Sequence, residues 1–293
     1  GLNAVMRAFA KYAYSHIEDV KIIGFLNGYT GLIEGDFETL AEKDFEDLLL
    51  AGGTMLGSKR QPFKQMTVTD ENNRSKLDKM KENYNRLGLD CLVTLGGAGT
   101  HKTAALLAAE GCNVIGLPKT IDNDIWGTDV TFGFNSAMEI ATECIDRMHS
   151  TAASHGRTML VEVMGNKVGW LTLYAGLAGG ANIILIPEIP YDEDAVVAVL
   201  EKRRKAGARY SIVAVAEGAL SKEEASLKKK DRLTLRAARG ETTVTQRLAR
   251  NIEARTGVET RTQVIGYLQR GGSPNPYDRA LCTLMGSYAG ELA

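Results

Sequence analysis

The chain has 293 residues, of which 44% are hydrophobic and 24% charged, and its formal net charge is −1 at pH 7. This length is sufficient for one large α/β unit or for two lobes with buried cores, and the composition is ordinary for a soluble globular protein. The nearly balanced charge provides no basic field for nucleic acid or an anionic membrane, and no apolar run approaches the roughly 20 residues that would span a bilayer.

The cysteines and the two ends of the chain limit the interpretation further. The four cysteines lie far apart and form no C-x-x-C pair, which excludes zinc and thioredoxin-like sites. Cys91 and Cys112 stand within apolar runs, as reduced core thiols do, so we expect a reducing, cytoplasmic location. The chain begins without methionine and ends within a helical pattern, so we expect that segments are missing at both ends.

Apolar runs of strand length alternate with longer amphipathic stretches along the chain. The runs predicted as buried strands are 20–25, 91–95, 113–117, 159–163, 182–186 and 211–216. The stretches predicted as helices are 75–87, 103–109, 136–150, 192–205 and 244–256. Short apolar strands that alternate with helices predict largely parallel sheets with helices on both faces.

The first candidate binding segment is Leu-Gly-Gly-Ala-Gly-Thr-His-Lys-Thr at 95–103, after a predicted strand. Its glycines allow the backbone to approach an anion closely, and the start of the following helix offers free N–H groups. His101 stands where a Walker A loop requires glycine before the lysine, so the segment is no P-loop. A tight strand–helix turn is the alternative interpretation of these glycines.

The second candidate segment is Pro-Lys-Thr-Ile-Asp-Asn-Asp at 118–124, directly after the next predicted strand. A carboxylate at the end of a strand can accept a hydroxyl proton, and a second carboxylate can hold Mg²⁺ directly or through water. Lys119 can neutralise phosphate charge. The alternative interpretation is an Asx-rich turn that caps the next helix.

Three further polar segments also follow predicted strands or flank them. They are Val-Glu-Val-Met-Gly-Asn at 161–166, Ala-Glu-Gly at 216–218 and Gly-Tyr-Leu-Gln-Arg-Gly-Gly-Ser-Pro at 266–274. Arg157 and Arg261 stand upstream of the first and the last of these segments, and arginine suits bidentate phosphate binding. Each segment alone is a weak signal, because a single surface arginine is usually only solvated.

Taken in this order, the segments resemble the phosphofructokinase family across essentially the whole chain. The runs 118–124 and 269–274 are the most specific, and 129–157 is most similar to the bacterial subgroup that contains both ATP and pyrophosphate users. Family members normally have a short strand and a glycine-rich loop before Gly1 and continue past Ala293.

The resemblance implies an α/β fold of two Rossmann-like lobes with largely parallel sheets flanked by helices. The donor lobe is expected at 1–125 and the sugar-phosphate lobe at 126–293, with the active site in the cleft between them. The implied reaction is the glycolytic transfer of a phosphoryl group from ATP, with Mg²⁺, to the 1-hydroxyl of fructose 6-phosphate, which gives fructose 1,6-bisphosphate. A homodimer or homotetramer is expected, without nucleic-acid or membrane partners.

The resemblance also assigns roles to individual residues. Asp122 is the implied general base, with Thr120, Lys119 and Asp124 beside it and Asp124 as a Mg²⁺ ligand. The implied sugar-phosphate residues are Thr120, Asp122, Arg157, Met164, Gly165, Asn166, Glu217, Arg261, Tyr267 and Arg270. The implied donor-site residues are Arg60, Gly97, Ala98, Gly99 and Thr100. Arg157 and Arg261 are expected to reach a neighbouring subunit's pocket and hold the 6-phosphate there.

Two departures from the family pattern qualify the expected chemistry. Ala98 stands where the family usually has an acid that helps to hold Mg²⁺, and a methyl group cannot ligate a hard cation. Asn166 stands where many ATP users have an arginine that faces the transferred phosphoryl group. A catalytically weakened or silent family member therefore remains an alternative.

The identity of the donor depends on two positions that point in different directions. In this family Gly99 leaves room for a nucleotide, whereas Lys119 is typical of pyrophosphate users. Steric exclusion is harder to evade than an extra positive charge, so we favour ATP and keep pyrophosphate as the alternative. NAD kinases and lipid kinases share a similar glycine loop but lack the runs 118–124 and 269–274.

Overall fold

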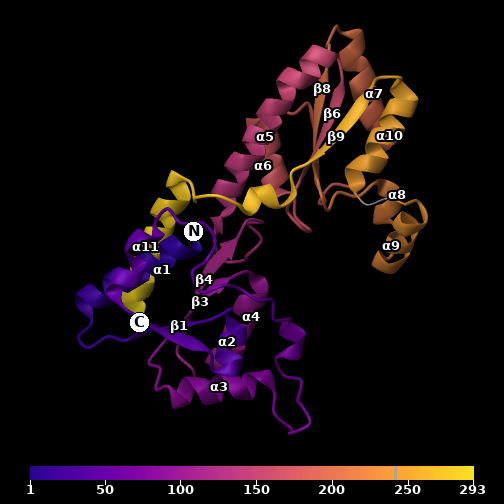
Figure 1. The fold of residues 1–293 in the computed structure, drawn as a ribbon. Coiled ribbons are helices and arrows are strands. Elements are labelled where there is room, and N and C mark those ends of the chain that lie inside the picture. Colours follow the sequence, from indigo (N-terminus) through magenta and orange to yellow (C-terminus); the bar gives the residue numbers. More distant parts are fainter. Residues whose placement is uncertain (241–242) are drawn as a thin grey trace. The chain divides into compact units, whose positions relative to one another are not determined.

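The computed structural model describes residues 1–240 and 243–293, and helices alternate with strands along the chain (Figure 1). The described residues divide into two compact units. Unit 1 comprises residues 1–120, 124–133 and 271–293, and unit 2 comprises residues 121–123 and 134–270. This division differs from the boundary predicted at residue 125, because the last 23 residues, 271–293, return to the first unit.

Unit 1 is an α/β unit with a parallel sheet of strand order β3-β4-β5. Its helices and strands are α1 (Leu2–His16), β1 (Ile22–Phe25), α2 (Tyr29–Glu34), β2 (Phe37–Leu40), the 3₁₀ helices Glu42–Leu48 and Phe63–Gln65, α3 (Lys76–Arg86), β3 (Leu92–Gly96), α4 (Ala98–Ala109), β4 (Val114–Thr120), β5 (Phe132–Gly133) and α11 (Pro276–Leu292). The predicted strand 20–25 forms as β1, but it pairs antiparallel with β2 in a separate ribbon.

Helices cover both faces of the β3-β4-β5 sheet. On one face Leu92 packs in a buried cluster with residues of α2, α3 and α4, among them Leu32, Met80 and Leu107. Side chains alternate along a strand, so Val93 and Leu95 pack on the other face, against α1 and α11. Unit 1 is therefore a sheet between two helical layers, as the alternation of apolar runs predicts.

Close packing of α1 against α11 brings residues 271–293 back to unit 1. A Cβ atom at Gly286 would lie 2.4 Å from the carbonyl oxygen of Val5, and one at Gly290 would lie 2.8 Å from the Tyr12 ring. A larger residue would require a shift of the α1 backbone at Gly286 and of the Tyr12 side chain at Gly290. The two glycines therefore allow the first and last helices to meet at short range.

Unit 2 is built on a parallel sheet of strand order β7-β8-β6-β9. Its helices and strands are α5 (Phe134–His155), β6 (Thr158–Val163), α6 (Trp170–Ala178), β7 (Ile183–Leu185), α7 (Glu193–Lys205), β8 (Ser211–Ala216), α8 (Lys222–Ala225), α9 (Lys229–Ala238), α10 (Val244–Thr256), β9 (Thr260–Val264) and the 3₁₀ helix Gly266–Arg270. Every residue of β6 and β8 is buried, as their mostly apolar sequences predict, and the burial includes Glu162 of β6.

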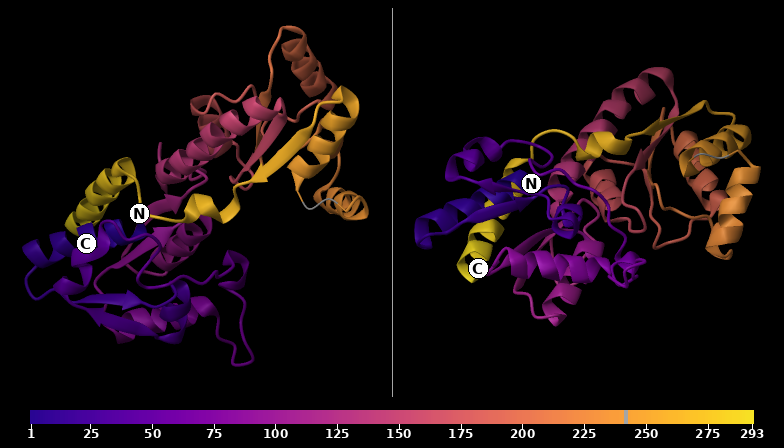
Figure 2. Two further views of the ribbon diagram at one scale, coloured as in Figure 1. Left: turned by 45° about the horizontal axis from the view of Figure 1, so that its top comes forward. Right: turned by 60° about the horizontal axis from the view of Figure 1, so that its bottom comes forward.

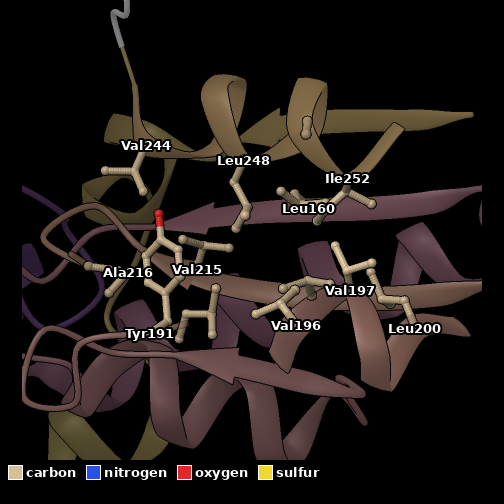
Figure 3. Close-up of a cluster of buried hydrophobic side chains, with 14 residues drawn as sticks. Leu160, Tyr191, Val196, Val197, Leu200, Val215, Ala216, Val244, Leu248 and Ile252 are labelled. Atoms are coloured by element: carbon tan, nitrogen blue, oxygen red, sulfur yellow. The ribbon is translucent and has the colours of Figure 1, made fainter. Parts of the chain in front are cut away.

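Helices also cover both faces of the unit 2 sheet, α5 and α6 on one face and α7 and α10 on the other (Figures 1 and 2). Figure 3 shows the cluster under α7 and α10, where Val196 and Leu248 meet Leu160 of β6. Ala141 and Ile145 of α5 pack on the opposite face. The two clusters fix the central strands, whose carboxyl ends carry the candidate site.

A buried charged network connects α10 with α8 and α9. Arg247 is 5% exposed, and its Nη2 atom donates to Oη of Tyr191 at 2.8 Å and to Oε2 of Glu224 at 3.1 Å. Nε of Arg236 donates to Oε1 of Glu224 at 2.7 Å. Burial alone would raise the pKa of Glu224, but the bonds from Arg236 and Ser221 and the charge of Arg247 together lower it.

Several elements differ from the sequence predictions in extent. Helix α4 begins at Ala98, within the glycine loop, whereas the sequence predicted a helix from residue 103. Strand β4 continues to Thr120 because its last two residues pair with β5, whereas the predicted strand ended at residue 117. Strand β9 and helix α6 had no counterpart among the predictions. No helix within the described residues is both long and apolar enough to cross a membrane.

Candidate active site

The first two candidate segments lie side by side at the carboxyl edge of the unit 1 sheet. Strand β3 ends at Gly96, which pairs in register with Pro118 of β4. A Cβ atom at Gly97 would lie 3.7 Å from the carbonyl oxygen of Lys119. The structure therefore brings the glycine loop next to Lys119 and Thr120, at the edge where open α/β sheets bind ligands.

The glycine loop forms the first turn of α4 and needs its small residues for different reasons. A Cβ atom at Gly96 would lie 2.1 Å from Oγ1 of Thr100, so a side chain is excluded there. A Cβ atom at Gly99 would meet no atom within 4 Å, so this residue faces open space. Gly97 is the N-cap of α4 and provides no side-chain cap, and the first turn carries no acid. Such a helix start presents N–H groups and a positive dipole end to an anion.

Helix α2 supports both the glycine loop and the segment of Arg60. Oη of Tyr29 donates a hydrogen bond to the carbonyl oxygen of Thr100 at 2.9 Å. Nε2 of Gln61 donates to Oγ1 of Thr30 at 3.0 Å, which anchors the chain beside the exposed Arg60. Burial raises the pKa of Tyr29, so its hydroxyl stays protonated and remains a donor. Sequence analysis assigned no role to Tyr29, since only the folded chain brings it to Thr100.

The segment 118–124 crosses from one unit to the other and back. Lys119 and Thr120 end β4, and the carbonyl oxygen of Thr120 accepts a hydrogen bond from Oγ1 of the buried Thr131 at 2.8 Å. Asp122 belongs to unit 2, whereas the exposed Asp124 belongs to unit 1. Between them Asn123 adopts a φ of 52°, a left-handed conformation that asparagine tolerates better than most residues. The chain therefore turns at Asn123, between the two carboxylates.

Residues 164–166 follow β6 at the carboxyl edge of the unit 2 sheet, and Glu217 holds their backbone. One carboxylate oxygen, Oε1 of Glu217, accepts hydrogen bonds from the amides of Gly165 at 3.1 Å and Asn166 at 2.7 Å. Gly165 has a φ of 155°, and a Cβ atom there would lie 2.5 Å from the carbonyl oxygen of Val168. The structure thus brings the predicted residues Gly165, Asn166 and Glu217 together.

The 3₁₀ helix Gly266–Arg270 approaches the same loop through Gln269. The Gln269 side chain is buried, and its Oε1 atom accepts a hydrogen bond from the amide of Met164 at 3.3 Å. On the same short helix, the guanidinium carbon of Arg270 lies 5.5 Å from the centroid of the Tyr267 ring. This distance allows a cation–π contact between the two predicted pocket residues. Gln269 was part of the motif 269–274, but sequence analysis assigned it no role.

Arg157 and Arg261 lie at the opposite, amino edge of the unit 2 sheet. Arg157 precedes β6, and Arg261 pairs in register with Met159 near the start of the same strand. The length of a strand, roughly 20 Å, separates them from Met164 at its other end. The structure therefore does not bring these two arginines together with Glu217 and the other predicted pocket residues of the same chain.

Glu259 joins the two arginines at the amino edge. Nε of Arg157 donates to its Oε2 atom at 2.6 Å, and Nη2 of Arg261 donates to its Oε1 atom. Arg261 also donates to Oε2 of Glu253 at 3.4 Å. The hydrogen bond from Arg157 is the main reason that the pKa of Glu259 is lowered, so the carboxylate remains charged and keeps both guanidinium groups in place.

The residues near the glycine loop suit a metal ion that phosphate groups hold for the most part. The described residues contain no group of three or more His, Cys, Asp or Glu side chains that could hold a metal ion. Asp124 is exposed and follows β4, and Ala98, the first residue of α4, carries no ligand atom. Mg²⁺ commonly binds through one or two carboxylates, water and substrate phosphates, so this donor set fits that mode of binding.

Comparison with known proteins identifies the family of the chain. The whole chain, residues 1–293, matches the family described as Phosphofructokinase. The chain belongs to the phosphofructokinase family. It is 56% identical over 295 residues to an ATP-dependent 6-phosphofructokinase of Spirochaeta thermophila, across 100% of this chain and 80% of the relative. It is 47% identical over 293 residues to ATP-dependent 6-phosphofructokinase 3 of Bacteroides thetaiotaomicron, across 100% of this chain and 81% of the relative.

Solved structures of phosphofructokinases share the fold. Phosphofructokinase from Saccharomyces cerevisiae has a TM-score of 0.82 and 29% identity, across 99% of this chain and 39% of that longer chain. Pyrophosphate-dependent phosphofructokinase from Marinobacter aquaeolei has a TM-score of 0.78 and 23% identity, across 99% of this chain and 72% of that chain. The expected α/β fold with two Rossmann-like lobes is therefore confirmed.

Proposed function

We propose that this phosphofructokinase family member transfers a phosphoryl group from ATP to the 1-hydroxyl of fructose 6-phosphate. The observation that carries the proposal is the match of the whole of this chain to relatives named ATP-dependent 6-phosphofructokinase, at up to 56% identity. The open space at Gly99 agrees with a donor larger than pyrophosphate. Transfer of this kind requires positioning, charge neutralisation and a base rather than covalent catalysis.

On the acceptor side, Asp122 takes the proton from the 1-hydroxyl as its oxygen bonds to the γ-phosphorus of ATP, and the bond from that phosphorus to the bridging oxygen breaks so that ADP leaves. A carboxylate with this task must reach the hydroxyl directly. Removal of such a base typically lowers the rate about 10²–10⁴-fold. Met164, Gly165 and Glu217 form the sugar pocket, with Tyr267 and Arg270 from the 3₁₀ helix.

On the donor side, the start of α4 binds the phosphate chain through the N–H groups of Gly97, Gly99 and Thr100. Lys119 adds a positive charge at the neighbouring strand end and stabilises charge on the transferred phosphoryl group. Arg60 extends the donor site from the segment that Gln61 anchors. When bound, Mg²⁺ neutralises charge on the phosphate oxygens, and Asp124 is the residue that would hold it, directly or through water.

The 6-phosphate of the sugar is bound by Arg157 and Arg261 of a neighbouring copy. Their location at the amino edge of the sheet, roughly a strand length from Met164, supports a role outside the pocket of their own chain. This part of the proposal requires a homodimer or homotetramer. We further propose a cytoplasmic location, which agrees with the four free thiols of the chain and with the phosphorylated substrates.

A coupled assay with each donor tests the proposal. Fructose 6-phosphate and Mg²⁺ are supplied with either ATP or pyrophosphate, and formation of the bisphosphate is measured. We expect turnover with ATP, and with pyrophosphate we expect a value of kcat/KM that is lower by about tenfold or more. Turnover with pyrophosphate alone would refute ATP as the donor. The absence of turnover with both donors would favour the catalytically silent alternative that Ala98 and Asn166 raise.

A further inference from the structure

The side chain of Gln269 connects two backbone segments that carry proposed substrate residues. Its Oε1 atom accepts from the amide of Met164 at 3.3 Å, and its Nε2 atom donates to the carbonyl oxygen of Gly266 at 3.1 Å. Gln269 is only 2% exposed, so both polar ends are removed from water and satisfied by protein. A buried amide with a donor and an acceptor bond of this kind fixes the distance between its partners.

Gln269 and Glu217 hold the same loop from two sides. Glu217 accepts from the amides of Gly165 and Asn166, and Gln269 accepts from the preceding amide, that of Met164. Three consecutive N–H groups are thus bound by side chains rather than by strand pairing. Because Gly165 has a φ of 155°, this loop has no regular conformation to rely on and depends on these acceptors.

The bond between Gln269 and Met164 ties the 3₁₀ helix to the loop, and the second bond of Gln269, to Gly266 of the same helix, stabilises that helix internally. Gly266 has a φ of 57°, so the chain turns sharply at the residue before Tyr267. Tyr267 and Arg270 are exposed and contact each other, whereas Gln269 between them is buried. Gln269 therefore anchors the helix while its neighbours project outwards.

We infer that Gln269 is a positioning residue for the sugar-phosphate pocket, which sets the distance between the Met164–Asn166 loop and the Tyr267–Arg270 helix. The inference rests on the proposed function. It predicts that loss of the Gln269 bonds weakens binding of fructose 6-phosphate selectively, because the proposed ATP-binding residues belong to the other unit. Gln269 acts through Met164 and Gly266 and does not itself contact the substrate.

The test compares three variants in steady-state assays with ATP and fructose 6-phosphate. Gln269→Met keeps the length of the side chain and removes both bonds, and we expect the KM for fructose 6-phosphate to rise about tenfold or more while the KM for ATP changes less than about twofold. Gln269→Glu keeps the acceptor for Met164 and loses the donor to Gly266, so a smaller rise is expected. Asn182→Met is the matched control, since it removes one similar bond, from the amide of Ile212 at 2.9 Å, at the amino edge of the same sheet.

The outcomes separate this inference from the proposed function. A wild-type enzyme without turnover on fructose 6-phosphate would refute the proposed function and this inference with it. An active wild type whose Gln269→Met variant is folded and keeps its KM for fructose 6-phosphate would refute the inference alone. An equal rise in the KM for fructose 6-phosphate in Asn182→Met would also refute the inference, because such a rise would indicate a general loss of stability.

Hydrogen exchange of the wild-type protein provides a readout if neither Gln269 variant folds. The amides of Met164, Gly165 and Asn166 follow β6 in the chain and lie outside its strand pairing. If Gln269 and Glu217 hold them as inferred, they exchange nearly as slowly as the buried strand itself. Exchange at the rate of an open loop would refute the inference.

Discussion

The carboxyl edges of the two sheets are built in different ways. At the edge of β3 and β4, the proposed donor residues present mainly backbone, because glycines and the uncapped start of α4 leave space and N–H groups. At the edge of β6 and β8, the side chains of Glu217 and Gln269 bind backbone amides and hold an irregular loop. The contrast is that exposed backbone N–H groups form the first edge, whereas side chains determine the shape of the second edge.

The largest expected effect concerns the base on the acceptor side. Asp122→Asn keeps the shape of the side chain but cannot accept the hydroxyl proton, so kcat should fall about 10³-fold while both KM values change little. Stopped or coupled assays measure the fall, and the melting temperature serves as the control for folding. If the kcat of Asp122→Asn stays within about tenfold of the wild-type value, the base is another group.

The next largest effect concerns stability within unit 2 rather than its site. Arg247→Met leaves the fully buried Glu224 with fewer partners, and the free energy of unfolding should fall by about 3 kcal/mol in urea titrations. Arg239→Met is the control, because its pair with Glu223 is exposed and should contribute less than about 1 kcal/mol.

The stability difference between wild type and Arg247→Met should depend on pH. The pKa of Glu224 is lowered in the folded protein, so its stabilisation is complete above its usual value of 4.5 and is lost as the pH falls through the folded pKa. The stability difference between wild type and Arg247→Met should therefore narrow below that pH. If the difference in the free energy of unfolding stays constant down to the acid transition, the loss of stability in Arg247→Met comes from packing and not from charge.

A smaller effect tests the backbone character of the donor edge. Gly99→Asp places a carboxylate beside the proposed phosphate site, and kcat/KM for ATP should fall about 100-fold. Gly99→Ala is the matched control, since its Cβ atom meets nothing within 4 Å, and it should stay within about threefold of wild type. Equal losses in both variants would show that space, and not charge, limits this position.

The smallest effect concerns the missing acid in the first turn of α4. Ala98→Asp supplies a carboxylate near the proposed metal position, and the Mg²⁺ concentration for half-maximal rate should fall about tenfold. Ala98→Asn, with a neutral oxygen, should have a weaker effect. An unchanged Mg²⁺ dependence in both variants would show that Asp124 and the phosphates suffice.

The sequence predicted the buried parts of the fold better than its edges. Strand β8 forms at the predicted residues 211–216 because all of its residues are apolar or small and buried. Strand β9, Thr-Arg-Thr-Gln-Val, was missed because it pairs with β6 alone, at the edge of the sheet, and exposes polar side chains. The predicted start of helix α4 lies after the observed start at Ala98. The reason is that glycines have low helix propensity, although here they form part of the first turn.

The candidate site was predictable where residues follow one another in the chain. The segments 95–103 and 118–124 meet because their strands are neighbours, which strand–helix alternation already implied. The support from Tyr29 to Thr100 and from Gln269 to Met164 was not predictable, because each bond joins residues far apart in the sequence. A buried polar side chain gives no periodic signal, and its partner is determined only by tertiary packing.

The close packing of α1 and α11 has a consequence for biosynthesis. Residues 2–16 leave the ribosome long before residues 276–292, and at about 5–20 residues per second the delay is on the order of tens of seconds. During this interval the apolar face of α1, with Val5 and Phe9, lacks its partner helix, while the residues 134–270 of unit 2 emerge without interruption. We expect unit 2 to fold first on the ribosome and unit 1 to close only after α11 is released.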